Sequence, residues 1–167
     1  MLKIRAGQPA DLDILKTLSA AARAEKAEQI YMDENVLAAV LARTLPGTVL
    51  LAFSDETPVG YCSFSVAGSI RFGRVELTLD DLYVLPAYRR QYFGKLLVNT
   101  AVRIGSDCLC TAVRWRCTAD MGQAFFAHCG APAPSAEGHY LATVTDIPHL
   151  AAFNPTCGCR HEMKDVR

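Results

Sequence analysis

The sequence predicts a single α/β (α+β) domain in which helices flank a mixed, mostly antiparallel central sheet. The 167-residue length suits one compact domain. Apolar residues at helical spacing predict helices at 9–22, 33–41, 91–105 and 120–129. Apolar runs or alternating apolar residues between turn signals predict strands at 3–5, 48–53, 59–66, 74–85, 111–117 and 139–144.

The first half of the chain begins with a short strand and continues with two helices. Pro9 opens the first helix, because proline suits the first helical turn. Asp33 caps the second helix, which ends before Pro46. Three strands follow, and two short strand–turn–strand connections predict antiparallel pairing.

In the second half, Pro86 ends the third of these strands and a helix follows. The strand, the helix and the next strand form a β-helix-β unit behind the antiparallel strands. Gly130 suits the end of the short fourth helix. The domain is expected to cover residues 1–148, and residues 149–167 are expected to form an irregular tail.

Composition excludes several classes of function. Seventeen basic residues balance seventeen acidic ones, whereas a dedicated nucleic-acid binder carries a strong basic excess. No run approaches the roughly 18 consecutive apolar residues that cross a bilayer, and the first residues lack the long apolar stretch of a secretory signal. We therefore expect a cytoplasmic protein with no nucleic-acid partner and no membrane association.

The chain has seven cysteines, an odd number that indicates free thiols in a cytoplasmic protein. Cys157, Cys159 and His161 lie close together near the C-terminus. Structural zinc usually takes four ligands, and no second pair with suitable spacing is present, so we expect no metal site.

Residues 82–95 carry the clearest chemical signal. They read as a strand, a turn with positive charge and the beginning of a helix, whose free amide groups form an anion site. Gly94 allows the backbone to approach a ligand closely, and Arg89, Arg90 and Lys95 can add charge-assisted hydrogen bonds. A pyrophosphate is the expected ligand.

Asp81-Leu82-Tyr83-Val84-Leu85-Pro86, the following Tyr88-Arg89 and Gly94 resemble the coenzyme-binding motif of the GNAT superfamily of N-acetyltransferases. The order of predicted elements also resembles that family up to about residue 144. The resemblance implies the GNAT acyl-CoA N-acyltransferase fold and acetyl-CoA as co-substrate. It implies that acetyl-CoA is bound by Leu82, Tyr83, Val84, Arg89, Arg90, Gln91, Tyr92, Phe93, Gly94 and Lys95.

The acidic pair Asp80-Asp81 and the segment 124–131 further resemble diamine acetyltransferases. Two residues depart from the family pattern. Tyr92 stands where the first glycine of the loop belongs, and a bulky residue there is expected to require a negative φ. Phe126 stands where many members have the tyrosine that protonates the departing thiolate.

The expected reaction is direct transfer of an acetyl group to a primary amine of a small molecule or a protein. Because an alkyl amine has a pKa of about 10.4, a carboxylate must remove its proton, directly or through a water. Asp80 is the first candidate for this base and Glu76 the second. Cys117, His128 and Tyr140 are alternative proton donors to the thiolate.

A second interpretation is a catalytically weak or inactive acyl-CoA-binding module of the same fold, which Tyr92 and Phe126 favour. The acceptor amine is not readable from the sequence. A homodimer is the default expectation for the assembly, because dimers are the commonest soluble oligomers.

Overall fold

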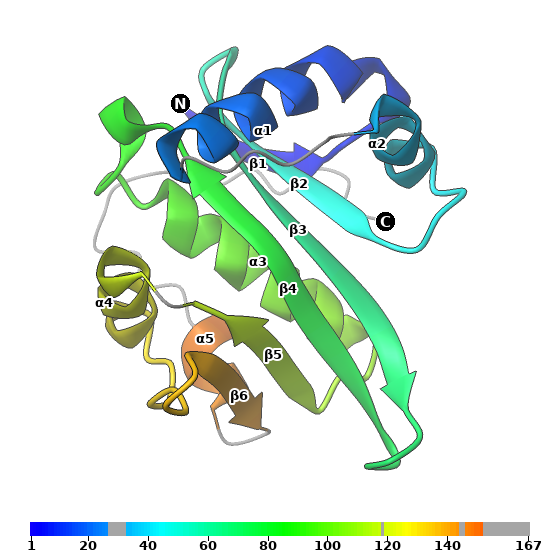
Figure 1. Ribbon diagram of the computed structural model, residues 1–167, viewed down its shortest axis with the longest axis vertical. Helices are drawn as coiled ribbons and strands as arrows, with labels where there is room; N and C mark the ends of the chain where they lie inside the picture. Colours follow the sequence, from blue (N-terminus) through cyan, green and yellow to red (C-terminus); the bar gives the residue numbers. More distant parts are fainter. Residues whose placement is uncertain (27–32, 118, 144–145, 152–167) are drawn as a thin grey trace. The chain divides into compact units, whose positions relative to one another are not determined.

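The six strands of the computed structural model form one sheet in the order β1-β2-β3-β4-β5-β6 (Figure 1). The structure describes residues 1–26, 33–117, 119–143 and 146–151. β1 and β2 are antiparallel, β4 and β5 are parallel, and β5 and β6 are antiparallel. The strands are β1 (Leu2–Ala6), β2 (Thr48–Ser54), β3 (Thr57–Ser69), β4 (Arg74–Val84), β5 (Ala112–Arg116) and β6 (His139–Thr143).

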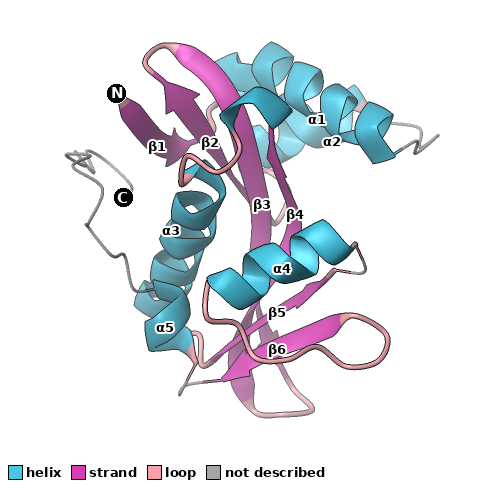
Figure 2. Cartoon of the chain, turned by 90° about the vertical axis from the view of Figure 1, so that its left-hand side faces the viewer, coloured by secondary structure: helices cyan, strands magenta, loops and turns pink. Residues whose placement is uncertain are grey.

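Helices lie along the chain where the sequence predicted them, between β1 and β2, between β4 and β5 and between β5 and β6, and a further helix follows β6. Figure 2 shows these helices in cyan and the strands in magenta. They are α1 (Leu12–Lys26), α2 (Glu34–Leu41), α3 (Phe93–Asp107), α4 (Asp120–His128) and α5 (Ile147–Ala151), with short 3-10 turns at Pro9–Asp11 and Pro86–Tyr88. The mixed sheet flanked by helices confirms the predicted fold class.

The chain divides into two compact units. The described part of the first unit lies within residues 1–63 and 81–97, and that of the second lies within residues 64–80 and 98–154. In the first unit, α1 and α2 contact each other. Their apolar faces pack with β2, Tyr61 and Tyr83 into one buried cluster that includes Leu15, Leu18 and Leu51. This cluster fixes α1 beside the last residues of β4.

Asp33 caps α2 as predicted, because its carboxylate accepts a hydrogen bond of 2.9 Å from the Asn35 amide. The beginning of the first helix needs a correction. Residues 9–11 form a 3-10 turn, and the α-helix starts at Leu12. The buried Asp11 explains the tight turn, because its carboxylate accepts from the Gln8 amide at 2.8 Å and binds Arg5 with two hydrogen bonds of 2.6 and 2.7 Å.

In the second unit, β5 lies between β4 and β6, with Glu76 opposite Ala112 and Trp115 opposite Tyr140. A Cβ at Gly105 of α3 would lie 2.6 Å from the Leu77 side chain, so this glycine permits the close packing of helix and strand. The predicted irregular tail from residue 149 needs a correction, because residues 147–151 form α5. Leu150 is buried and its carbonyl accepts from the Asn99 side chain at 3.1 Å.

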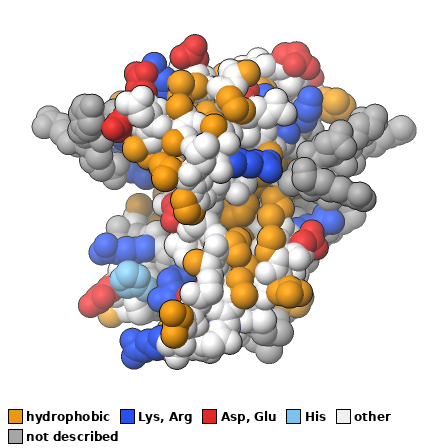
Figure 3. Space-filling model, turned by 90° about the vertical axis from the view of Figure 1, so that its right-hand side faces the viewer, with side chains coloured by type: hydrophobic (Ala, Val, Ile, Leu, Met, Phe, Trp, Pro, Cys, Tyr) orange, Lys and Arg blue, Asp and Glu red, His pale blue; other side chains and the backbone are white. Residues whose placement is uncertain are grey.

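The charges of the described surface are mixed. Figure 3 shows acidic and basic side chains distributed over the face in view, with hydrophobic side chains between them. Among the described residues, no helix is long and apolar enough to cross a membrane. No group of three or more candidate metal ligands occurs there either, and the Cys157, Cys159 and His161 tail lies outside the described residues.

Candidate functional site

The segment between β4 and α3 forms a tight turn followed by a helix N-terminus. A 3-10 turn covers Pro86–Tyr88, where the Tyr88 amide donates to the Leu85 carbonyl at 2.9 Å. The chain then reaches Phe93, the first residue of α3. The strand, turn and helix predicted for this segment therefore follow one another as expected.

Two residues of this turn have the left-handed backbone conformation. Arg90 has a φ of 59° and Tyr92 a φ of 69°. The expectation that Tyr92 requires a negative φ is therefore wrong. The backbone at Tyr92 therefore has a conformation that favours glycine. The left-handed region costs other residues about 1–2 kcal/mol.

The first turn of α3 presents unused hydrogen-bond donors. The Leu96 amide donates to the Tyr92 carbonyl at 2.9 Å. The amides of Phe93, Gly94 and Lys95 precede it, and within the described part of the chain they have no hydrogen-bond acceptor. Together with the positive end of the helix dipole, these three amides form a ready anion site.

Two cations stand beside these amides. Arg90 is exposed and Lys95 is half-buried, and neither has an ion pair among the residues that the structure describes. Gln91 is exposed, and its side-chain amide donates to the Ala87 carbonyl at 3.1 Å. Phe93 is buried and packs edge-on against Tyr88, so it anchors the start of the helix.

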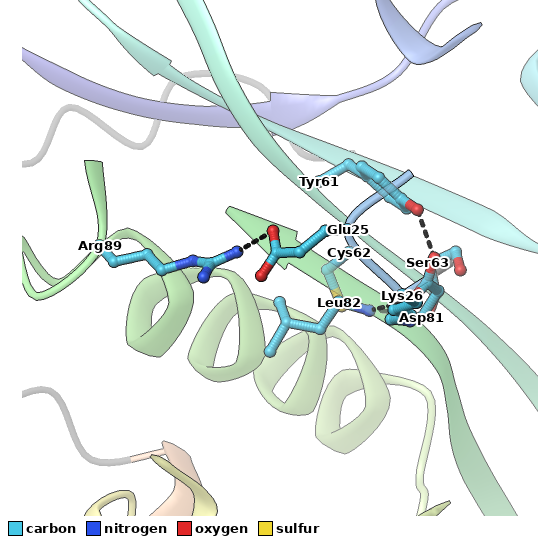
Figure 4. A network of polar contacts seen from close by, with 8 residues as sticks. All are labelled: Glu25, Lys26, Tyr61, Cys62, Ser63, Asp81, Leu82 and Arg89. Atoms are coloured by element: carbon cyan, nitrogen blue, oxygen red, sulfur yellow. Dashed lines mark hydrogen bonds and ion pairs between the residues drawn. The ribbon is translucent and has the colours of Figure 1, made fainter. Parts of the chain in front are cut away.

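Arg89 differs from its neighbours because its guanidinium is already bound within the chain. Its Nε donates to the Val84 carbonyl at 2.9 Å, and its Nη2 pairs with Glu25 Oε2 at 2.6 Å (Figure 4). This pairing lowers the pKa of Glu25 and raises the pKa of Arg89. Sequence reasoning assigned Arg89 to the anion, but here its guanidinium joins β4 to the last turn of α1.

Asp81 forms a second link between β4 and α1. Its carboxylate accepts from the Tyr61 hydroxyl, from the Leu82 amide at 2.9 Å and from Lys26 Nζ at 3.4 Å (Figure 4). Tyr61 is buried, and burial followed by the nearby Asp81 charge raises the pKa of its hydroxyl. Its hydroxyl therefore remains protonated and donates the hydrogen bond.

Tyr83 is buried beside Tyr61, with ring centroids 6.3 Å apart. Burial and then the Glu25 carboxylate raise the pKa of its hydroxyl. The guanidinium carbon of Arg89 lies 5.7 Å from the Tyr83 ring. The roles of Glu25, Lys26 and Tyr61 were not predicted from the sequence. The only local signal was a pair of charged residues at the end of an amphipathic helix.

The two candidate bases lie on the part of β4 that belongs to the second unit. Asp80 is exposed. Glu76 is only 12% exposed in its side chain, and its oxygens are engaged by Arg74 at 2.7 Å and by Arg114 at 3.1 Å. The pairing of β4 with β5 covers Glu76 to Thr78, so Asp80 lies beyond the paired residues.

Phe126 belongs to an aromatic cluster of the second unit. Its ring lies 4.9 Å from Trp115 and 5.7 Å from Tyr140, centroid to centroid. Tyr140 is buried and stacks on Trp115, and burial followed by the nearby Cys117 thiol raises the pKa of its hydroxyl. His128 is exposed at the end of α4.

A hollow lies on the described surface of each unit. In the first unit a hollow of about 290 Å³ lies between α1 and Pro58 and Leu85. In the second unit a hollow of about 410 Å³ is lined by Arg114, Ser135, His139, Tyr140 and Leu141. Neither hollow includes a residue of the loop from Arg89 to Lys95.

Solved structures with this fold include an aminoglycoside acetyltransferase from an uncultured soil metagenomic sample in complex with sisomicin. It has a TM-score of 0.71 and 20% identity, over 85% of this chain and 95% of that one. An N-acetyltransferase, PaiA, from Thermoplasma acidophilum in complex with coenzyme A has a TM-score of 0.67 and 20% identity, over 84% and 96%.

A ribosomal-protein-alanine N-acetyltransferase from Brucella melitensis biovar Abortus 2308 has a TM-score of 0.67 and 16% identity, over 81% and 95%. No curated protein sequence matches the chain. The profile of the acetyltransferase (GNAT) family matches residues 13–131, which span α1 to the end of α4 and include the whole loop described above. The chain therefore belongs to the GNAT acetyltransferase family.

Proposed function

We propose that the protein is an N-acetyltransferase that moves an acetyl group from acetyl-CoA to a primary amine. One observation carries the coenzyme part of this proposal. The left-handed turn at Arg90 and Tyr92 leads into three helix amides that have no acceptor among the described residues. Such a cradle suits a diphosphate, because amide donors and the helix dipole both favour an anion.

The residues present fit this coenzyme. The amides of Phe93, Gly94 and Lys95 would hold the diphosphate, and Arg90 and Lys95 would add charge. The main chain of Leu82 to Val84 would pair with the amides of the pantetheine arm, as an added strand does. When bound, acetyl-CoA supplies a thioester, whose acetyl group passes to the amine as the C–S bond breaks and the C–N bond forms.

The acceptor amine must lose a proton before it attacks, and we assign this proton to Asp80. Asp80 is exposed and lies beyond the residues of β4 that pair with β5. Glu76 suits the role less well, because its side chain is only 12% exposed. It accepts hydrogen bonds from Arg74 and Arg114. Those bonds give Glu76 a structural role in holding β4 to β5.

Asp80→Asn tests this assignment. The variant should bind coenzyme A as the wild type does, but its rate should fall about 10²–10⁴-fold near pH 7, the usual contribution of a general base. The rate should recover at high pH, where the amine loses its proton unaided. An unchanged rate at pH 7 would move the role to Glu76 or to water.

The alternative is a module that binds an acyl-CoA with little turnover. Phe126 favours it, because this residue has no hydroxyl and is packed among Trp115, Tyr140 and Phe125. The transferase remains the better proposal. The thiol of the coenzyme has a pKa of about 8.5 by analogy with cysteine, so the thiolate can leave unprotonated near neutral pH.

Two measurements separate these functions. Thiol release from acetyl-CoA is followed with a panel of amines that includes an aminoglycoside, a diamine and a peptide with a free N-terminus. Thermal stabilisation by coenzyme A is measured in parallel. Stabilisation with turnover supports the transferase, and stabilisation without turnover supports the module. No stabilisation by acetyl-CoA or coenzyme A would refute both.

Gly94→Val is the matching variant. A branched side chain in the first turn of α3 would stand between the free amides and the diphosphate. We expect coenzyme A no longer to stabilise the variant against thermal unfolding. The unliganded variant should stay folded, because valine can adopt the backbone conformation of a helix. Coenzyme binding that survives this substitution would place the diphosphate elsewhere.

The cytoplasmic location and the homodimer remain predictions.

A further inference from the structure

One edge of the last residues of β4 carries the main-chain groups assigned above to the pantetheine arm. The Leu85 amide donates to the Val59 carbonyl of β3 at 2.9 Å. Successive residues of a strand point their main-chain groups to alternate edges. Leu82 and Val84 therefore direct their N–H and C=O groups away from β3.

In this structure one main-chain group of each residue, the Leu82 N–H and the Val84 C=O, already has a side-chain partner. The Leu82 amide donates to Asp81 Oδ1 at 2.9 Å. The Val84 carbonyl accepts from Arg89 Nε at 2.9 Å. Side chains thus cap the same strand edge that an added strand, or the pantetheine amides, would use.

Both capping side chains are held by consecutive residues at the end of α1. Lys26 Nζ lies 3.4 Å from Asp81 Oδ1, and Glu25 Oε2 lies 2.6 Å from Arg89 Nη2 (Figure 4). The two ion pairs have opposite polarity, because the basic residue comes from α1 in one and from the turn after β4 in the other. The last turn of α1 therefore contributes an ion pair to each cap, and Tyr61 of β3 also binds Asp81.

We infer that Glu25 and Lys26 are positioning residues that restrain coenzyme binding, by holding Arg89 and Asp81 on main-chain groups that the coenzyme needs. The inference rests on the proposed function. The binding-competent state is the one in which the caps have moved away. Because the apparent dissociation constant is the intrinsic one divided by the fraction of competent molecules, weaker caps give tighter binding.

The pair Glu25–Arg89 adds a second effect of the same sign. While Arg89 is bound to Glu25, its guanidinium is directed to α1. Release from Glu25 would free a third cation beside Arg90 and Lys95 at the diphosphate cradle. A conventional stabilising role of the two pairs predicts the opposite result, namely weaker coenzyme binding after their removal.

The test is the double variant E25Q/K26Q, which removes both ion pairs and leaves the net charge unchanged. Ion pairs near the surface are individually weak, so the dissociation constant of coenzyme A should fall roughly three- to tenfold. Isothermal titration calorimetry with coenzyme A measures it. The matched control is K16Q/E34Q, which removes a pair of 2.8 Å between α1 and α2 and should leave the affinity unchanged.

The single variant K26Q sharpens the test. Loss of a positive charge should weaken the binding of a polyanion, so tighter binding by K26Q supports the inference directly. The Lys26 and Glu25 side chains are 49% and 36% exposed and lie outside the buried cluster, so the variants should fold, and thermal unfolding checks this. Unchanged or weaker binding by E25Q/K26Q beside a wild type that binds would overturn the inference alone. No binding by the wild type would overturn it together with the proposed function.

Discussion

The left-handed backbone of Tyr92 can be tested by comparing Tyr92→Gly with Tyr92→Ala. Both substitutions remove the phenol ring of Tyr92, a residue that is 47% exposed, and they differ in packing only by the exposed Cβ. They differ in backbone preference. At a φ of 69°, alanine carries the left-handed cost of about 1–2 kcal/mol and glycine carries none.

Glycine also lowers the free energy of unfolding by about 0.4–1 kcal/mol relative to alanine, because the unfolded chain has more conformational entropy when it contains glycine. The difference leaves Tyr92→Gly more stable than Tyr92→Ala by roughly 0.5–1 kcal/mol. Urea unfolding at equilibrium measures this difference as a shift in midpoint at constant slope.

Gln91 supplies the matched control, because it is the adjacent exposed residue and its φ is not positive. There the order should reverse, with Gln91→Ala more stable than Gln91→Gly by about 0.4–1 kcal/mol. Equal stabilities at position 92, or a more stable Tyr92→Ala, would show that the loop does not hold Tyr92 in the left-handed region. The cradle assigned to the diphosphate would then have a different backbone.

Two further predictions concern the stability of the first unit. Asp33→Ala should destabilise the protein by about 1 kcal/mol in urea unfolding, because the Asn35 amide loses its cap. Asp33→Asn should retain most of that stability, because asparagine also caps helices well. Equal losses in the two variants would argue against the cap. Arg5 holds the pKa of the buried Asp11 below its usual value, so the Asp11 carboxylate stabilises the fold above about pH 4 and this contribution is lost as the pH falls below that. Asp11→Asn should therefore cost about 2 kcal/mol at pH 7 and progressively less as the pH falls below about 4, and a difference that does not shrink on acidification would contradict this account.

The sequence was sufficient for most of the fold because its signals are local. The cap at Asp33, the apolar stripe of α1 and the turn at Asp55 each act within a few residues. α5 was missed because Pro148 suggested a break. Proline is tolerated in the first turn of a helix, and Pro148 is the second residue of α5.

The candidate site was predicted only where it is continuous in sequence. The loop from Arg89 to Lys95 could be assigned because strand, turn and helix start follow one another. The partner of Arg89 lies 64 residues away in α1, and the partner of Asp81 in β3 lies 20 residues away. Those contacts depend on the packing of the α1 cluster against Tyr61 and Tyr83, which no local pattern specifies.

Tyr92 shows which property of glycine this loop position uses. A glycine supplies both a positive φ and the absence of a side chain, and the sequence cannot show which of the two the loop needs. Here a tyrosine has a φ of 69° and remains 47% exposed, so the turn keeps its backbone while much of the side chain lies in solvent. The amides of Phe93 to Lys95 are still without acceptors in the described chain. Under the proposed function, the diphosphate cradle requires at this position the direction of the chain, which a large residue adopts at a cost of about 1–2 kcal/mol.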